Sequence, residues 1–361
     1  MTQTFLKDSL MDFYKVRQFQ EFCGIRECKA DDPRGEDAIV CESQPERKAK
    51  QHTARFRATK PWLHEFFMLG SFFGTEMFYI TYLPLIFWGY EHWTGRRLIQ
   101  IWVITMYIGQ VLKEFFQMPR PTSPPAFPME PNFKAEFGFP STHAIAGASL
   151  AFGTLLSVCG PQDAIFPFGL LLAIAFTAWV AFSRLYKGMH SILDILGGLA
   201  ITAIYLFFGW RHLSEVDHYI QTVPFSPIIC LASNFVLGWF YPNGDCPSRK
   251  DTVIILGVGA GVNIANWLNF KQGLDYDVFA QPEWHIIVFR VVHGLLLTGL
   301  AREVAKNAMK KILTKVFGPI DSENIRKQAI EVPLQYFTYT FVGFTVVYLA
   351  PLLLLNLGLY R

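Results

Sequence analysis

KEFFQMPRP at residues 113–121, PSTHAIAG at 140–147 and SRLYKGMHSILD at 183–194 are three short polar sequences that interrupt an otherwise apolar region. Ionisable side chains are costly at membrane depth, so those that persist beside apolar segments usually serve a pathway or a binding site. Because two expected membrane crossings separate the second sequence from the third, we expect all three at one membrane face. The region therefore predicts a helical membrane bundle with a polar site at one boundary.

The composition of the whole chain agrees with a membrane protein. Of its 361 residues, 52% are hydrophobic and 17% are charged, whereas an ordinary soluble domain carries about 25% charge. The net charge of +3 is small, and the basic residues are spread among apolar segments, which argues against a nucleic-acid partner. The six cysteines show no CxxC spacing, so we expect free thiols.

Apolar segments long enough to cross a bilayer recur along the chain. A span needs about 20 mostly apolar residues in a helix. We therefore expect an all-α bundle of about nine spans, near residues 68–90, 98–117, 143–159, 165–183, 190–210, 224–241, 252–270, 284–301 and 337–358. Within these, Gly257 and Gly261 are spaced for close helix contact. The basic stretch 302–327 predicts a separate amphipathic helix at the membrane surface.

The chain divides at about residue 61 into a polar N-terminal segment, 1–61, and a transmembrane domain, 62–361, that contains the three polar sequences. Four apolar residues are spaced to share one face of a short interfacial helix: Leu6, Leu10, Phe13 and Val16. Residues 24–61 are expected to form a solvated linker, because they carry a basic run and few apolar residues.

The third polar sequence pairs an imidazole with a carboxylate. His190 and Asp194 are four residues apart, so they lie on one face of a helix and can touch. A carboxylate beside an imidazole fixes its tautomer and stabilises the imidazolium that forms on reaction. The alternative is a pair that only satisfies two buried polar groups. A short turn after Arg184 brings its guanidinium back to the side where His190 lies.

The second polar sequence begins a helix. Ser141 or Thr142 can cap it, and the free N–H groups of a helix N-terminus favour an anion. His143 stands in the first turn, where it could give a proton to a leaving oxygen; plain capping with an interfacial histidine is the alternative. A metal site of His143, His190 and Asp194 is a further alternative, although such sets normally include a fourth donor.

The first polar sequence ends a helix with two cations. Lys113 lies about two helical turns before Arg120, and prolines at 119 and 121 stop the helix. Together with Arg184 they supply three cations, which suit the charge and geometry of a phosphate. Because phosphoryl transfer depends largely on positioning and electrostatics, no metal ion or other cofactor is expected. The acidic residues that magnesium would need are expected to be missing around the site.

Together the three sequences resemble the tripartite signature of the type-2 phosphatidic-acid phosphatase superfamily. Within it the chain is most similar to the sphingosine-1-phosphate phosphatases. That resemblance is carried by GRRLIQIWVITMYIGQVLKEFFQMPRPTSPP at 95–125, FPSTHAIAG at 139–147, SRLYKGMHSILDILGG at 183–198 and VVHGLLLTGLAREV at 291–304. It covers about residues 65–358. Thr142 stands where the wider superfamily more often has glycine, a feature that the sphingosine-1-phosphate branch shares.

The resemblance implies a role for each site residue. His190 resembles the nucleophile that forms a phosphohistidine, and Asp194 resembles its orienting carboxylate. His143 resembles the acid that protonates the leaving alcohol and later activates water. The implied phosphate-binding residues are Lys113, Arg120, Ser141, Thr142 and Arg184.

The resemblance also implies a metal-independent membrane hydrolase of sphingosine 1-phosphate, dihydrosphingosine 1-phosphate and phytosphingosine 1-phosphate. One alternative keeps the chemistry but changes the substrate to phosphatidate, lysophosphatidate or a polyprenyl diphosphate. A less favoured alternative is a non-catalytic transporter or scaffold, although no repeat symmetry is visible. The family implies an endoplasmic-reticulum membrane protein with a lumenal site. The positive-inside rule, applied to nine spans and the basic stretch 302–327, would instead make that face cytosolic.

Overall fold

The computed structural model describes residues 10–28, 40–41, 55–130, 136–243, 246–274, 283–320, 325 and 327–359. Before the first polar sequence ends, the elements are α2 (Phe13–Phe22), β1 (Ile25–Cys28), β2 (Val40–Cys41), β3 (Arg55–Ala58), α3 (Pro61–Phe72), α4 (Glu76–Gly89) and α5 (His92–Phe116). The later ones are α6 (Thr142–Val158), α7 (Phe166–Tyr186), α8 (Ile192–Gly209), α9 (Leu213–Thr222), α10 (Ser226–Trp239), α11 (Pro247–Gln272), α12 (Trp284–Phe317), α13 (Gln328–Phe344) and α14 (Ala350–Asn356).

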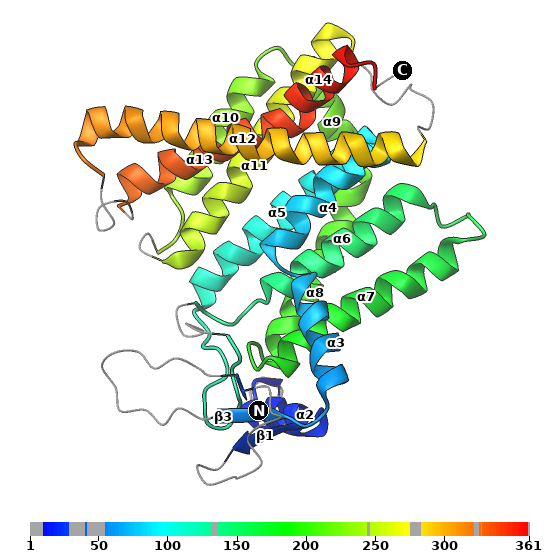
Figure 1. Ribbon diagram of the computed structural model, residues 1–361, viewed down its shortest axis with the longest axis vertical. Coiled ribbons are helices and arrows are strands. Elements are labelled where there is room, and N and C mark those ends of the chain that lie inside the picture. The colour runs from blue at the N-terminus through cyan, green and yellow to red at the C-terminus, as the bar shows by residue number, and fades with distance from the viewer. Residues whose placement is uncertain are drawn as a thin grey trace.

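Helices α4 to α8 occupy the middle of the molecule, as Figure 1 shows, with α9 to α14 beside them and the N-terminal elements at the opposite end. Helix α5 packs against α4, α6 and α11, while α6 also packs against α7 and α8. Large apolar side chains of α5, such as Leu98 and Trp102, form one hydrophobic core with Ile145 and Leu150 of α6. This core holds α5 against α6, and a second cluster, of Ala144 with Ala181 and Leu185, holds α6 against the end of α7.

Within the described residues, five helical segments are long and apolar enough to cross a bilayer: 166–186, 192–222, 247–272, 284–317 and 328–356. Helices α6 and α10 are apolar but shorter. The protein is therefore a multi-pass helical membrane protein, but the expected count of about nine spans is not confirmed. A turn at residues 73–75 divides the span expected at 68–90 into α3 and α4.

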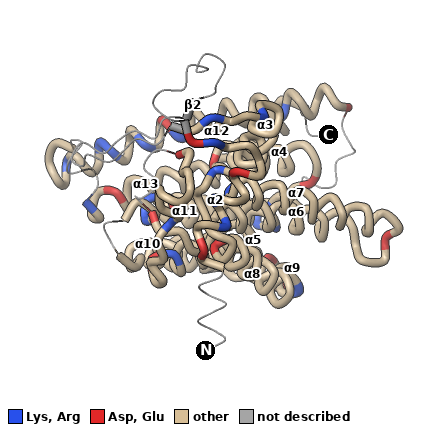
Figure 2. Tube along the Cα trace, turned by 90° about the horizontal axis from the view of Figure 1, so that it is seen from below, with Lys and Arg blue, Asp and Glu red and all other residues tan. Residues whose placement is uncertain are grey.

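Helix α12 is one continuous helix of 34 residues, roughly 50 Å long at 1.5 Å per residue. The basic residues expected in an amphipathic helix over 302–327 are therefore helical as far as Phe317, but they continue the preceding helix and do not form a helix of their own. Seen from below in Figure 2, Lys and Arg positions recur along α12, and charges of both signs gather around α2.

The expected close contact at Gly257 and Gly261 is confirmed. A Cβ added at Gly257 would lie 2.7 Å from the carbonyl oxygen of Tyr336, and one added at Gly261 would clash with the carbonyl oxygen of Thr340. Both carbonyls belong to α13, so the two glycines allow the backbones of α11 and α13 to approach closely.

The N-terminal segment contains ordered structure in the part that is described, contrary to the solvated linker expected at 24–61. Strands β1, β3 and β2 form a three-stranded antiparallel sheet in that order. Ile25 and Phe56 are buried, and the ring of Phe56 lies 4.7 Å from that of Phe127. Burial of these apolar side chains is favourable enough to hold a short sheet against the membrane domain. Leu6, expected on the helical face, lies outside the described residues.

Helix α2 begins at Phe13, after a break at residues 11–12, so Leu10 does not share its face as expected. The helix is bonded to the loop that precedes α6. The Gln20 side chain is fully buried; it donates to the carbonyl oxygens of Phe127 (2.8 Å) and Tyr186 (2.9 Å) and accepts from the Phe127 amide (2.9 Å). Arg17 donates to the carbonyl oxygen of Pro125 at 3.1 Å. These bonds connect segments more than a hundred residues apart, so α2 helps to position the loop between the first two polar sequences.

Candidate active site

The three polar sequences meet at the ends of α5, α6 and α7. Lys113 lies in the last turn of α5 and Arg184 in the last turn of α7, while His190 lies in the short connection between α7 and α8. Each of these three side chains is only 1% exposed. A cavity of about 420 Å³ is lined by Arg120, Thr142, His143 and Arg184, among others. The helix ends thus place Arg120, Arg184 and His143 around one partly open cavity, whereas Lys113 and His190 are buried nearby and are not among its lining residues.

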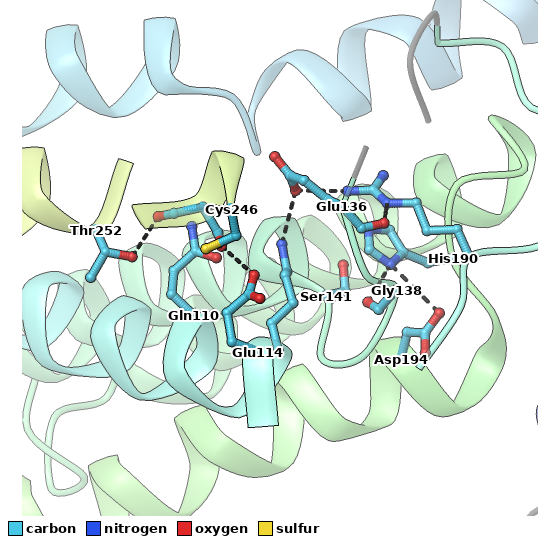
Figure 3. A network of polar contacts seen from close by, with 12 residues as sticks. Gln110, Glu114, Glu136, Gly138, Ser141, His190, Asp194, Cys246 and Thr252 are labelled. Atoms are coloured by element: carbon cyan, nitrogen blue, oxygen red, sulfur yellow. Dashed lines mark hydrogen bonds and ion pairs between the residues drawn. The ribbon is translucent and has the colours of Figure 1, made fainter. Parts of the chain in front are cut away.

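Two of the cations share one carboxylate. Glu136 accepts from the Lys113 ammonium at 3.1 Å and from the Arg120 guanidinium at 2.9 Å, as Figure 3 shows for Glu136 and its neighbours. The charge of Lys113, followed by that of Arg120, lowers the pKa of Glu136 against the opposing effect of burial. Glu136 is therefore ionised at neutral pH and neutralises part of the cationic set.

A second carboxylate engages the remaining cations. Glu130 accepts from Arg184 at 2.8 Å and from Lys187 at 2.7 Å. Burial alone would raise the pKa of Glu130, but Arg184 and Lys187 together outweigh it and hold that pKa well below the usual range. Arg184 also donates to the hydroxyl of Ser71 at 2.9 Å. The guanidinium is thereby fixed from two sides.

The expectation that acidic residues are missing around the site was wrong. Glu130 and Glu136 both line the cavity, but their oxygens are occupied by cations rather than arranged for a metal. Among the described residues, no group of three or more His, Cys, Asp or Glu side chains is placed to hold a metal ion.

The tautomer of His190 follows from its hydrogen bond. Its Nδ1 lies 3.0 Å from the carbonyl oxygen of Gly138, and a carbonyl can only accept, so Nδ1 carries the hydrogen. Nε2 is buried and has no hydrogen-bond partner within the described chain; it therefore carries a free lone pair. Burial, followed by the charges of Arg120 and Arg184, places the pKa of His190 well below its ordinary value. The imidazole is neutral at neutral pH.

Asp194 contacts the backbone beside His190 more closely than it contacts the imidazole. Its Oδ2 lies 3.6 Å from His190 Nδ1, which is too long for a hydrogen bond. The same oxygen accepts from the Ser191 amide at 2.7 Å in a capping box at the start of α8. The Asp194 carbonyl oxygen accepts from the Ser141 amide at 2.9 Å. Asp194 thus joins the second and third polar sequences, and the Gly138 carbonyl makes the bond expected of its carboxylate (Figure 3).

The start of α6 carries the second imidazole. The Ser141 hydroxyl caps the helix by accepting from the Ala144 amide at 3.4 Å, as the sequence predicts. His143 follows in the first turn and lines the cavity together with Thr142. A Cβ added at Gly74 would lie 2.7 Å from the His143 ring. The turn between α3 and α4 therefore packs closely against His143 and limits where its ring can go.

Sequence reasoning missed four contributors to this site. Glu130 and Glu136 are the acidic residues of the loop between the first and second polar sequences, and their position opposite three expected cations was an available signal. Lys187 lies inside the third sequence. Nothing in the sequence marks the Gly138 carbonyl, because every residue has one.

The region that forms this site matches known proteins. Residues 95–216 match the family model described as the PAP2 superfamily. The chain is 33% identical to sphingosine-1-phosphate phosphatase 2 of Homo sapiens, over 97% of this chain and 98% of the relative. It is also 33% identical to sphingosine-1-phosphate phosphatase 1 of Rattus norvegicus, over 82% of this chain and 73% of the relative.

More distant relatives and solved structures complete the comparison. The chain is 25% identical to a dihydrosphingosine 1-phosphate phosphatase of Schizosaccharomyces pombe, over 71% of this chain and 65% of the relative. No solved structure matches the chain. The similarity to the human relative extends over nearly the full length of both proteins and includes the helices that form the cavity. The chain therefore belongs to the sphingosine-1-phosphate phosphatase family of the PAP2 superfamily.

Proposed function

We propose that this lipid phosphate phosphatase hydrolyses sphingosine 1-phosphate and related long-chain base phosphates through a phosphohistidine on His190. The observation that carries the proposal is the free lone pair of buried His190 Nε2 beside Lys113, Arg120 and Arg184. Relatives named for sphingosine 1-phosphate and dihydrosphingosine 1-phosphate support the substrate class. A neutral, oriented imidazole beside fixed cations suits attack on a phosphate.

In the proposed first step, the substrate phosphate takes the place of the Glu130 and Glu136 carboxylates on the cations. His190 Nε2 attacks phosphorus, the N–P bond forms, and the bond from phosphorus to the lipid oxygen breaks. His143, which the charge of the bound phosphate keeps in its protonated form, gives its proton to the departing oxygen and becomes neutral. The Gly138 carbonyl accepts the Nδ1 hydrogen of the phosphorylated imidazole, whose positive charge this hydrogen bond stabilises.

In the proposed second step, His143 takes a proton from a water molecule as that water attacks phosphorus. The N–P bond breaks, inorganic phosphate forms, and His190 returns to its neutral tautomer. Lys113, Arg120, Arg184 and the capped start of α6, with Ser141 and Thr142, stabilise the charge on the phosphoryl oxygens throughout.

A panel of lipid phosphates tests the substrate class. Purified protein should release phosphate from sphingosine 1-phosphate with a kcat/KM at least about tenfold above that for phosphatidate, lysophosphatidate or a polyprenyl diphosphate. Vanadate should inhibit the reaction and a chelator should leave it unchanged. Preference for a glycerolipid phosphate would favour the alternative enzyme, and no phosphate release from any member would favour a scaffold or transporter.

Glu136→Gln is expected to strengthen binding of inorganic phosphate or vanadate about three- to tenfold, because Lys113 and Arg120 are released from a competing charge. The measurement is the inhibition constant of each anion for Glu136→Gln, compared with that for wild-type protein. The exposed Glu215→Gln serves as the matched control. Weaker anion binding in Glu136→Gln would instead mean that the carboxylate organises the two cations for the phosphate.

We also propose that the protein lies in the endoplasmic-reticulum membrane with its site facing the lumen. The family resemblance supports this location. Because α2 is bonded to the loop of the site, a tag at the N-terminus reports the side on which the site lies. Protection of that tag from protease in sealed microsomes is the expected result, and digestion would reverse the sidedness.

A further inference from the structure

A second cavity adjoins the one that contains the cations. Its volume is about 220 Å³, and apolar side chains such as Leu83, Trp102 and Val346 make up most of its lining. Four residues line both cavities: Glu76, Tyr79, Asp251 and Ile255. Ile80, also in the lining, is 47% exposed, so the apolar cavity reaches the outer surface of the bundle. A headgroup in the first cavity could therefore continue into an apolar chain in the second.

Two carboxylates stand at the junction of the two cavities; Arg302 also lines the apolar cavity, but its guanidinium pairs with Glu303. Asp251 lies near the start of α11 and Glu76 begins α4. Within the described part of the chain, neither carboxylate has an ion-pair or hydrogen-bond partner. This contrasts with Glu130 and Glu136, which are held by cations in the same cavity.

The same cavity also contains a buried side-chain oxygen that lacks a hydrogen-bond donor. Gln110 of α5 is 4% exposed and lines the cavity, yet its Oε1 has no partner among the described residues. A buried amide oxygen without a hydrogen bond costs about 1–3 kcal/mol, so such a group is usually explained by a ligand. Figure 3 shows Gln110 one turn before Glu114 on the helix that also carries Lys113.

The charges decide which headgroup fits. For a lipid whose only charged group is a phosphate, carboxylates facing the anion site are repulsive. For a lipid with an ammonium close to its phosphate, they supply the missing counter-charge while the cations bind the phosphate. Opposed patches of this kind select between ligands by repelling one as well as attracting the other.

We propose that Asp251, with Glu76 at the mouth and Gln110 as hydrogen-bond acceptor, binds the ammonium group of a long-chain base phosphate while the apolar cavity receives its alkyl chain. The proposal rests on the function proposed above and names the residues that select its substrate. Asp251 is the dominant member because Glu76 is exposed and its charge is more strongly screened by solvent.

Three lipids of equal chain length test the proposal. They are sphingosine 1-phosphate, its N-acetyl derivative, which loses the positive charge, and lysophosphatidate, which has no amine. Asp251→Asn is expected to lower kcat/KM for the first about ten- to a hundredfold. For the other two it should leave kcat/KM unchanged or raise it, because the substitution removes a carboxylate that repels their phosphate. Glu76→Gln should show the same pattern with a smaller loss, and Glu215→Gln, on the exposed surface of α9, should show none.

The possible outcomes separate this inference from the proposed function. Equal loss on all three lipids would make Asp251 a structural residue, and no loss on any would remove it from the site; either result overturns the inference. A wild-type protein that releases phosphate from none of the three would instead overturn the function. The thermal transition of a Glu76→Gln, Asp251→Asn double variant is the control for folding. If it is unchanged from that of wild-type protein, misfolding does not explain the loss of activity.

Discussion

His190→Ala should release phosphate at least about a thousandfold more slowly than wild-type protein, because no other described group offers a free lone pair in the same position. With radiolabelled lipid phosphate and rapid acid-free quenching, wild-type protein should carry label in an acid-labile bond, and His190→Ala should carry none. His212→Ala is the matched control, because the His212 side chain is 65% exposed. The control should retain wild-type rate and label.

His190→Asn separates chemistry from packing. The asparagine amide can still donate to the Gly138 carbonyl, which His190 meets at 3.0 Å, but it offers no nucleophilic nitrogen. We expect a folded protein with the same loss of turnover as His190→Ala. Labelled phosphoprotein or near-normal turnover in His190→Asn would falsify the phosphohistidine mechanism, provided that its thermal transition matches that of wild-type protein.

Arg184→Ala is expected to lower kcat/KM about a hundred- to a thousandfold, because it removes a buried guanidinium that lines the cavity and is proposed to bind the phosphate. Arg184→Lys should recover only part of the loss, since an ammonium cannot make two parallel bonds to phosphate. Steady-state kinetics on all three proteins measures the effect. The exposed Arg211→Ala provides the control.

The same substitution should move the pH profile. Arg184 is among the charges that lower the pKa of His190, so its removal raises that pKa. Because the neutral imidazole is the reactive form, the acid limb of kcat/KM should then shift to higher pH. If kcat/KM falls but the pH of its acid limb does not change, Arg184 contributes to substrate binding and does not affect the pKa of His190. Unchanged kcat/KM would contradict the proposed role of Arg184 in binding the phosphate.

The two glutamates explain how the cations remain buried before substrate arrives. A lysine and two arginines enclosed near one another repel, and unpaired charge is costly in a low dielectric. Glu136 offsets part of the charge of Lys113 and Arg120, and Glu130 offsets part of the charge of Arg184 and Lys187. Each carboxylate thereby stands in for the charge of a phosphate oxygen. We infer that substrate binding exchanges one set of anionic oxygens for another and leaves the cations in place.

Much of the fold was readable from local patterns. Apolar segments of helical length predicted the membrane helices, and Ser141 predicted the start of α6, because capping and hydrophobic burial depend on neighbouring residues. The expected count of about nine spans was not confirmed among the described residues. The same reasoning missed the sheet of β1, β2 and β3, whose burial depends on Phe127 and other residues distant in the sequence.

By itself, the sequence determined which residue types stand at the ends of the helices and that these ends share one side, because both follow from helix length and the order of crossings. Only the tertiary structure decided what each group faces. In the structure the Gly138 carbonyl oxygen accepts from His190 Nδ1, and Glu130 and Glu136 form ion pairs with the cations. Asp251 lies where the two cavities join. Such pairings arise from the packing of segments that are distant in the chain, and packing is specified by the shape of the whole core rather than by any local pattern.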